Sequence, residues 1–402
     1  MAGSVPAERS GEAQATGAPR AGVPVVIAVG RETAAGEQRV ATVPEVVQKL
    51  VKAGFEVRVE HDAGACAFCP DDSFIAVGAK IAPGRSDLLK GAHIVLCVQP
   101  PTIADTGLFS EGTIVVGFMN PAGNLDAIRA MRDKKVTAFA LELVPRISRA
   151  QSMDALSSQA TAGGYVAAVM GAAHCPKFLP MLTTAAGTIR PATVLILGAG
   201  VAGLMAIATA KRLGALVEAY DVRRAAGEQV RSLGAKFLEL EINAEGSGGY
   251  ARELTPEEKV KEQQMVSAAV ARADIVITTA AIPGRKAPVL ITRETVAAMR
   301  PGAVIIDMAA ESGGNCELTV AGTTVHDHGV MIIGPRNLPA RIAFHASQMY
   351  AKNLQSFLTL LVDKNGALTR DFSDEILAAS LLVHAGEVRH QPTRDLLAGG
   401  RS

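Results

Sequence analysis

A glycine-rich turn is the stretch of this sequence whose residue types most clearly predict chemistry. It follows the apolar run 194–197, reads Gly198-x-Gly200-x-x-Gly203, and continues into small and apolar residues at helical spacing. In that context Gly198 permits a tight turn, Gly200 lets a pyrophosphate approach the backbone, and Gly203 lets the helix pack close to the strand. The unpaired N–H groups at the helix N-terminus then favour phosphate. The pattern predicts a dinucleotide site, and a tight helix–strand packing without ligand is the alternative.

An acidic residue follows at the spacing expected for ribose recognition. Asp221 stands at the end of the strand predicted over 216–220, where a carboxylate can bond an adenine-ribose hydroxyl and repels a 2′-phosphate. Arg223 and Arg224 come directly after it and could accept a 2′-phosphate instead. Because Asp221 comes first in the chain, we expect the site to prefer NAD(H) to NADP(H).

A second candidate is the polar segment 142–158, which carries two arginines and several side-chain donors. It lies before the Ala/Gly-rich stretch 160–173 and allows two interpretations. It is either a domain linker with a capped helix start or a set of contacts to the nicotinamide half of the cofactor. Composition alone does not separate the two.

Three later segments also carry polar residues at expected loops. The glycine-rich stretch 242–258 predicts a mobile lid or, alternatively, a disordered surface loop. Residues 279–284 follow a strand and should face the cofactor, because ligands bind at the carboxyl ends of strands in open α/β sheets. Asp307, Glu311 and Asn315 lie near another strand end, where a carboxylate either bonds a loop or does chemistry.

Elements that could position these residues fall into two halves. Strands are predicted at 24–29, 55–59, 94–98, 113–118 and 136–140, with helices at 43–53 and 124–134, and this half lacks a glycine-rich turn. The second half has strands at 194–197, 216–220, 236–240, 275–278, 304–308 and 329–334. A long amphipathic helix over 339–362 should cross back to the first half, and 363–402 reads as short helix, loop and tail.

The predicted fold is therefore α/β, with two Rossmann-like doubly wound parallel-sheet domains around a cleft. The first domain is discontinuous, covering 23–156 plus 345–402, and the NAD(H)-binding domain covers 157–344. Residues 1–22 contain no apolar segment and are predicted to be a disordered tail rather than a signal peptide.

Composition excludes several classes of protein. The chain has 402 residues, 49% of them apolar and 20% charged, which suits two globular domains. A net charge of +1 gives no reason to expect nucleic acid as a partner. Five cysteines without a signal peptide favour a reducing compartment. Cys66-x-x-Cys69 lacks a second ligand pair, so we predict incidental thiols and no metal site.

Several segments together resemble one family. They are PRISRAQSMDALSSQ, LGAGVAGLMAIATAKRLGA, YDVR, GGYA, ITTAAIPG and IIDMAAESGGNCE, in an order and spacing that run from about residue 25 to residue 362. They resemble the NAD(H)-binding component, the alpha subunit or domain I, of the proton-translocating NAD(P) transhydrogenases. That component dimerises, binds NADH and passes a hydride directly to NADP⁺ on a separate component. A membrane component couples the transfer to proton movement.

The resemblance implies site residues in five segments. Gln151, Arg146 and Asp154 would be catalytic, with Gln151 at the junction of the two nucleotides. The implied cofactor contacts are Arg146, Ile147, Ser148, Arg149, Gln151, Asp154, Ser157, Gly198, Gly200, Val201, Gly203, Asp221, Val222, Arg223, Gly249, Tyr250 and Ala281. Direct hydride transfer needs no acid or base, which accounts for a sequence without a convincing nucleophile or His–carboxylate pair.

The resemblance also implies partners. We expect a homodimer, an NADP(H)-binding transhydrogenase component and a membrane-spanning proton-channel subunit. The chain would be cytoplasmic and peripheral, held on the cytoplasmic face of the inner membrane through those subunits. Because it ends before membrane helices, it resembles the type whose membrane part is a separate subunit.

Two rival interpretations remain open. Alanine dehydrogenase, a structural relative, needs an arginine, a lysine and a histidine in its first domain. Arg39 in EQRVA matches the arginine, but Gln99 stands in place of the lysine and Met119 in the loop expected to hold the histidine. Neither Gln nor Met can take up a proton at neutral pH. The third interpretation is a non-catalytic NAD sensor.

Overall fold

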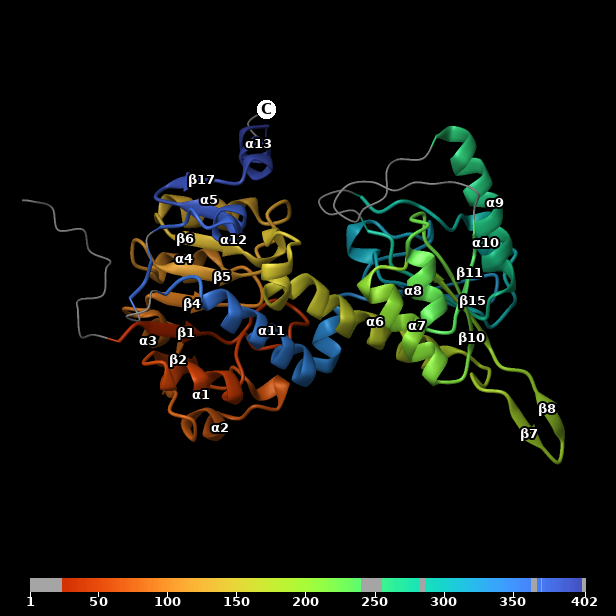
Figure 1. Cartoon of the computed structure of the whole chain (residues 1–402), viewed down its shortest axis with the longest axis horizontal. Coiled ribbons are helices and arrows are strands. Elements are labelled where there is room, and N and C mark those ends of the chain that lie inside the picture. Colours follow the sequence, from red (N-terminus) through yellow and green to blue (C-terminus); the bar gives the residue numbers. More distant parts are fainter. Residues whose placement is uncertain (1–23, 240–254, 282–285, 363–366, 370, 400–402) are drawn as a thin grey trace, which may run out of the picture.

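The computed structural model of the chain has two lobes, each built on its own β-sheet (Figure 1). It describes residues 24–239, 255–281, 286–362, 367–369 and 371–399. We call the half built on the 8-stranded sheet the first lobe and the half built on the 7-stranded sheet the second lobe. Two helices connect the lobes and pack against each other, α6 (Ala155–His174) and α11 (Ala343–Leu358).

The first lobe has the strand order β17-β16-β6-β5-β4-β1-β2-β3. Its strands are β1 Val26–Val29, β2 Glu56–Glu60, β3 Lys80–Ala82, β4 Ile94–Leu96, β5 Ile114–Gly117, β6 Thr137–Ala140, β16 Leu381–His384 and β17 Glu387–Val388. Its helices are α1 Pro44–Lys52, α2 Asp71–Ile75, α3 Arg85–Leu89, α4 Ile103–Leu108, α5 Leu125–Asp133, α12 Glu375–Ser380 and α13 Gln391–Gly399. The strands from β1 to β6 are parallel, whereas β16 pairs antiparallel with β6 and with β17.

The second lobe has the strand order β11-β10-β9-β12-β13-β15-β14. Its strands are β9 Thr193–Leu197, β10 Leu216–Tyr220, β11 Lys236–Phe237, β12 Ile275–Thr278, β13 Val304–Asp307, β14 Thr324–Asp327 and β15 Val330–Ile333. Its helices are α7 Val201–Arg212, α8 Ala226–Ser232, α9 Pro256–Arg272 and α10 Arg293–Ala297. A separate hairpin, β7 Leu182–Thr184 and β8 Gly187–Ile189, projects from this lobe (Figure 1).

Both sheets are covered by helices on both faces, which explains the unbroken apolar runs of their central strands. In β9, Val194 and Ile196 pack in the core that includes α6 and α7, while Leu195 and Leu197 pack in the core that includes α9. The side chains of β1 alternate in the same way. Ile27 packs in the core on one face of the first sheet, and Ala28 packs in the core on the opposite face. Side chains of successive strand residues point to opposite faces, so a strand between two cores is apolar throughout.

The strand order confirms the predicted α/β fold class with two doubly wound sheets. Two details of the prediction are wrong. Each sheet is mixed rather than wholly parallel, because β14, β16 and β17 run antiparallel to their neighbours. The segment 363–402, predicted as short helix, loop and tail, contains β16 and β17 as well as α12 and α13.

The long helix predicted over 339–362 is shorter, since a 3₁₀ turn at Leu338–Ile342 precedes α11. Its side chains Tyr350, Leu354 and Phe357 lie in the core of the first lobe. The domain boundaries proposed from the sequence stay a prediction, and the tail 1–22 lies outside the described residues. Among the helices that the structure describes, none has both the length and the apolar character that crossing a bilayer requires.

Candidate functional site

The glycine-rich turn lies between β9 and α7, where the strand order of the second sheet reverses. Gly198 has a φ of 101°, and Gly203 packs so tightly that a Cβ there would lie 1.9 Å from the carbonyl oxygen of Gly198. A Cβ on Gly200 would meet no atom within 4 Å. Gly198 and Gly203 are therefore needed for the shape of the turn, while Gly200 faces open space at the N-terminus of α7.

The loop after β12 is held against this turn by hydrogen bonds. The Thr279 hydroxyl donates to the carbonyl of Gly198 at 3.0 Å. The Asn315 side chain accepts from the amide of Ala280 at 3.1 Å and donates to its carbonyl at 2.8 Å. Ala281 follows directly and is exposed. Thr279 and Ala280 therefore lie against the turn, and contact of Ala281 with the cofactor stays a prediction.

Asp307 is a structural carboxylate in the described structure. It is fully buried and accepts hydrogen bonds from the Thr278 hydroxyl at 2.8 Å and from the backbone amide of Asn315 at 2.7 Å. The Thr319 hydroxyl donates to it at 2.6 Å. Of the two roles that the sequence left open for this residue, bonding a loop is the one found.

Asp221 stands at the end of β10, next to the glycine-rich turn. Its carboxylate is buried and accepts from the backbone amide of Ala199 at 2.8 Å. The guanidinium of Arg223 donates to both carboxylate oxygens, at 2.9 Å from Nε and 2.8 Å from Nη2. The sequence treated these two residues as rivals for a ribose or a 2′-phosphate, and the structure pairs them. Val222 lies between them and packs partly buried in the core that includes α9.

The polar segment 146–157 forms the capped start of α6. Asp154 accepts from the Ser157 amide at 2.9 Å and from the Ser157 hydroxyl at 2.6 Å. Before it, a 3₁₀ turn runs over Ser148–Met153, and within it Gln151 is exposed. The linker with a capped helix start is therefore present, and contact with the nicotinamide stays a prediction.

Arg149 is turned toward a different region of the molecule. Its guanidinium donates to Asp374 at 2.8 Å, and this hydrogen bond lowers the pKa of the Asp374 carboxyl. Arg146 and Ser148 are exposed, and Ile147 packs partly against the core of the first lobe. The segment therefore presents accessible polar side chains near the start of α6, whereas Arg149 is engaged elsewhere.

A close helix contact connects this segment to the glycine-rich turn. A Cβ on Gly164 of α6 would lie 2.1 Å from the carbonyl oxygen of Ala202 in the first turn of α7. The middle of α6 therefore lies against the first turn of α7. The adjacent glycines Gly163 and Gly164 inside a helix were a signal for this close approach that the sequence analysis missed. Gly249 and Tyr250, the predicted lid residues, lie outside the described residues.

The corresponding point of the first sheet is filled by a glutamate. Glu32 follows β1 and accepts from the backbone amides of Val98, at 2.6 Å, and Gln99, at 3.2 Å, which follow β4. Burial raises the pKa of Glu32 to about 7. Glu142 does the same one strand further along, accepting from the amides of Met119 and Asn120, and burial raises its pKa.

A third glutamate of the first lobe, Glu37, is strongly paired. Glu37 accepts from Arg39 Nε at 2.8 Å and Nη2 at 2.6 Å, and from the Gln99 amide group at 2.9 Å. Burial alone would raise the pKa of Glu37, but the hydrogen bonds and charge of Arg39 hold it at about 2. Arg39 is thus engaged by an internal carboxylate, a pairing that the sequence analysis did not foresee.

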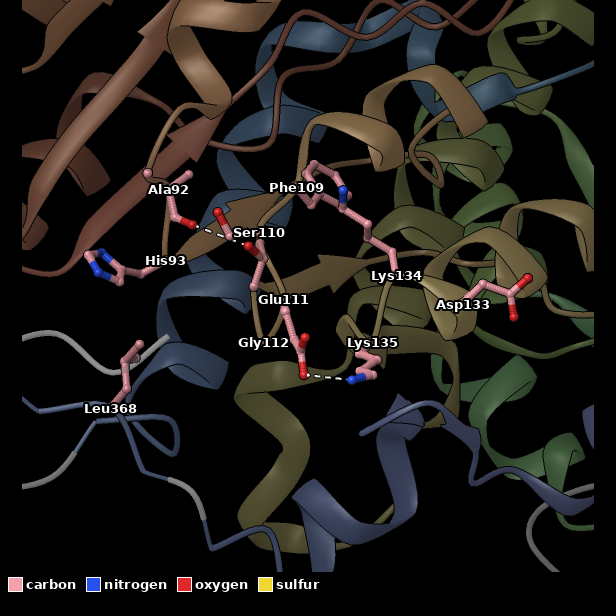
Figure 2. Close-up of a pocket in the computed structure, with 12 residues that line it drawn as sticks. Ala92, His93, Phe109, Ser110, Glu111, Gly112, Asp133, Lys134, Lys135 and Leu368 are labelled. Atoms are coloured by element: carbon pink, nitrogen blue, oxygen red, sulfur yellow. Dashed lines mark hydrogen bonds and ion pairs between the residues drawn. The ribbon is translucent and has the colours of Figure 1, made fainter. Parts of the chain in front are cut away.

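A pocket of about 610 Å³ lies at the opposite edge of the first sheet (Figure 2). Its lining includes His93, Glu111 and Lys135, which precede β4, β5 and β6 respectively. Lys135 pairs with Glu111 at 3.2 Å. Because ligands of open α/β sheets bind at the carboxyl ends of the strands, we do not assign the dinucleotide to this amino edge.

One group of possible metal ligands occurs among the described residues, formed by His61, Asp62 and Asp71. The His61 ring lies 2.6 Å from an Asp71 oxygen and 3.3 Å from an Asp62 oxygen. The hydrogen bond to Asp71 and the two negative charges raise the pKa of His61. The three side chains form an ion-paired group at the surface, away from the glycine-rich turn.

Comparison with known proteins gives consistent matches along most of the chain. The family described as "Alanine dehydrogenase/PNT, N-terminal domain" matches residues 28–162, and "Alanine dehydrogenase/PNT, C-terminal domain" matches residues 167–391. A protein of Rhodospirillum rubrum, named as the first portion of an NAD(P) transhydrogenase subunit alpha, is 48% identical over 374 residues, covering 90% of this chain and 97% of that protein.

Two solved structures are also similar. A transhydrogenase from Sinorhizobium meliloti superposes with a TM-score of 0.83 at 45% identity, covering 90% of this chain and 99% of that one. An L-alanine dehydrogenase superposes with a TM-score of 0.78 at 25% identity, covering 93% and 99%. Both matches span the two lobes.

Proposed function

Because the chain belongs to the alanine dehydrogenase/PNT family, among its NAD(P) transhydrogenase alpha subunits, we propose that it binds NAD(H) and exchanges a hydride with NADP(H) on a partner subunit. The observation that carries this proposal is the turn at Gly198–Gly203 with Asp221 beside it. Open space at Gly200 and the N-terminal amides of α7 suit a pyrophosphate.

We assign the adenine-ribose end of the dinucleotide to the edge around β10. Asp221 accepts from a ribose hydroxyl, and its charge disfavours a 2′-phosphate. Val201 lies at the start of α7, where its amide faces the phosphates, and Val222 and Arg223 border the ribose. This assignment makes NAD(H), rather than NADP(H), the preferred dinucleotide of this chain.

The nicotinamide end is assigned to the segment 146–157. The exposed Gln151 and Arg146 orient the nicotinamide and its ribose, while Asp154 and Ser157 hold the start of α6 in place. Ala281 borders the same space from the loop after β12. These residues supply position and electrostatics only, since a hydride passes between two nicotinamides without a proton donor.

An alanine dehydrogenase activity is disfavoured by two positions. Met119 is fully buried, and the Gln99 side chain donates to Glu37. Neither can act as the proton-transferring group that oxidation of an amino acid requires. A non-catalytic NAD sensor stays the other alternative.

We further propose that the chain is a homodimer in a complex with an NADP(H)-binding component and a membrane-spanning proton-channel subunit, on the cytoplasmic face of the membrane. The Rhodospirillum rubrum relative is named as one portion of an alpha subunit, which supports the existence of further subunits. The projecting hairpin supports a second copy of the chain as a partner, because Phe178, Met181 and Ile189 around it are exposed. An isolated two-stranded hairpin is only marginally stable by itself.

Stopped-flow mixing of NADH-loaded chain with an NADP⁺-loaded transhydrogenase component tests the function. We expect hydride transfer only when that component is present and no NADH formation from alanine plus NAD⁺. Gln151→Asn should slow transfer about 10-fold and leave NADH affinity nearly unchanged, because an interaction at the reacting end acts mainly on the rate. NADH formed from alanine by the chain alone, or tight NADH binding with no transfer to any component, would reject the proposal.

A further inference from the structure

A group of polar side chains joins the carboxyl edges of the two sheets. Glu37 and Arg39 follow β1, Gln99 follows β4, Gln159 lies in α6, and Asn337 follows β15 of the second lobe. We call these five residues the cross-lobe cluster. Its members come from both lobes and from a connecting helix.

Arg39 is the centre of this cluster. Its guanidinium is buried, with 4% of the residue exposed, and donates from Nη1 to Gln159 at 2.8 Å and from Nη2 to Asn337 at 3.1 Å. Asn337 in turn donates to Glu37 at 3.0 Å. Two hydrogen bonds of this group therefore cross directly between the segment after β1 and the segment after β15.

The cluster sits where the chain passes between the lobes. Gln159 belongs to α6 and also donates to the carbonyl of Ala346 in α11, at 3.1 Å. Asn337 directly precedes the 3₁₀ turn that leads into α11. The guanidinium of Arg39 therefore bonds to α6 through Gln159 and to the segment before α11 through Asn337. Because the guanidinium is planar and rigid, it fixes both the distance and the relative orientation of these two acceptors.

The same bonds leave little of the guanidinium for an outside ligand. Nε and Nη2 donate to Glu37, and Nη1 donates to Gln159. A substrate carboxylate would have to displace an internal carboxylate whose pKa is held at about 2, so it competes with a partner that remains ionised. This geometry favours a structural task for Arg39 over the binding of an external anion.

We propose that Arg39 and Asn337 form a tie that fixes the angle between the two lobes and so positions the nicotinamide of bound NAD(H). The proposal rests on the function proposed above, in which the segment 146–157 holds the nicotinamide end of the dinucleotide and the turn at 198–203 holds its pyrophosphate. A change of lobe angle moves these two contacts relative to each other. Hydride transfer falls steeply when the reacting atoms are misplaced by about 1 Å. Arg39 and Asn337 are thus positioning residues.

The test uses Asn337→Gly. Asn337 has a φ of 44°, which glycine adopts without strain, and the Arg39–Glu37 pair remains, so no buried charge is left alone. Lobe separation is measured by pulsed electron paramagnetic resonance between spin labels on the exposed Cys66 of the first lobe and on Arg300→Cys in the second, in a Cys175→Ser background. Labelled chains are diluted with unlabelled ones.

We expect Asn337→Gly to broaden the distance distribution with and without NADH. Hydride transfer should fall about 10-fold while NADH affinity changes less than about threefold, a split that a general loss of folding would not give. Arg39→Lys should act in the same direction, because an ammonium cannot serve three acceptors in one plane. His328→Gly is the matched control, since His328 also has a positive φ but lies in the turn between β14 and β15.

If the distribution of distances between the spin labels is unchanged in Asn337→Gly, the proposal that Asn337 helps to fix the lobe angle is overturned. A broadened distribution with unchanged hydride transfer would overturn its positioning role. Failure of the wild-type chain to transfer hydride would reject the proposed function instead, and the distance measurement would still decide whether the tie exists.

Discussion

The two sheets have the same strand order at their centres but different carboxyl edges. In the first lobe, Glu32 and Glu142 accept the backbone amides that follow β4 and β5. In the second, the turn with Gly200 leaves open space in front of α7. The same topology therefore leaves open space before a helix N-terminus in the second lobe, whereas in the first lobe two glutamates occupy the backbone amides at the strand ends.

Loop length explains the difference. α7 begins at Val201, directly after the turn that follows β9, so its amides point at the reversal in strand order. β1 ends at Val29, and the next helix, α1, begins only at Pro44. The first lobe thus has no helix N-terminus at the equivalent place among its described residues, and the long loop supplies Glu32 and Glu37 instead.

The largest loss of NADH binding is expected from Gly203→Ala. A Cβ 1.9 Å from the Gly198 carbonyl must push α7 away from the turn. We expect NADH affinity to fall by more than about 100-fold, equivalent to about 2.7 kcal/mol, and the free energy of unfolding to fall by about 1–3 kcal/mol. Calorimetric titration and urea unfolding measure the two quantities.

Gly200→Ala is the matched variant for that prediction. Its φ is ordinary and its Cβ meets no protein atom within 4 Å, so the free energy of unfolding should stay within about 0.5 kcal/mol of wild type. NADH affinity should still fall about 10-fold or more, because the methyl group occupies the approach of the pyrophosphate. Normal NADH binding by Gly200→Ala would contradict the assignment of the pyrophosphate to the turn at 198–203.

Asp221→Ala should have the next largest effect. Removing the carboxylate frees Arg223 from its ion pair and removes the charge that repels a 2′-phosphate. We expect the ratio of NADH to NADPH affinity to fall about 10-fold, or about 1.4 kcal/mol. Fluorescence titration with both dinucleotides measures it, and an unchanged ratio would show that Asp221 does not read the ribose.

Glu32→Gln should leave NADH affinity unchanged, lower the free energy of unfolding at every pH because the Gln amide nitrogen cannot accept from Val98 or Gln99, and alter the pH dependence of stability. The pKa of Glu32 is about 7 in the folded chain and 4.5 in its ordinary state, so the folded state holds a proton that the unfolded state has lost between these values. The free energy of unfolding therefore falls as pH rises from 4.5 to 7, by at most about 1.4 kcal/mol per pH unit. Gln cannot titrate, so the variant should lose the part of this slope that Glu32 contributes, while the part from Glu142, whose pKa burial also raises, remains.

Glu37 supplies the internal control for that experiment. Its pKa is lowered to about 2, so its contribution to stability is present above pH 4.5 and is lost as pH falls toward 2. The loss of stability between pH 4.5 and 2 should therefore still be present in Glu32→Gln, when unfolding is followed by circular dichroism across the pH range. If the free energy of unfolding of Glu32→Gln fell with pH between 4.5 and 7 as steeply as that of the wild type, Glu32 would not be a buried acid with a raised pKa.

The sequence predicted those regions of the fold that depend on local order. The apolar runs, the turn at 198–203 and the strand before Asp221 follow one another along the chain, so their spacing reveals the second sheet. β16 was missed because its partner is remote, as the contact between Thr137 and His384, 247 positions apart, illustrates. The hairpin β7–β8 was missed because its exposed strands lack an apolar face.

The candidate site was predictable to the same extent. The glycines of the turn could be recognised because each is required by contacts to residues nearby in the sequence, so that their spacing forms a motif. The Asp221–Arg223 pair and the capture of backbone amides by Glu32 depend on where side chains meet in space, which spacing does not encode. The roles given to Gln151, Gly249 and Tyr250 stay predictions, the last two outside the described residues.

The double crossing of the chain between the lobes has a consequence for synthesis on the ribosome. β6 can acquire its neighbour β16 only after the whole second lobe has left the exit tunnel. Until then the edge of β6 and the surface that α11 will cover are exposed to water, and such surfaces are sites for misassembly. The second lobe, whose strands are continuous in the chain, can fold at once. The lobe made first is therefore the lobe completed last.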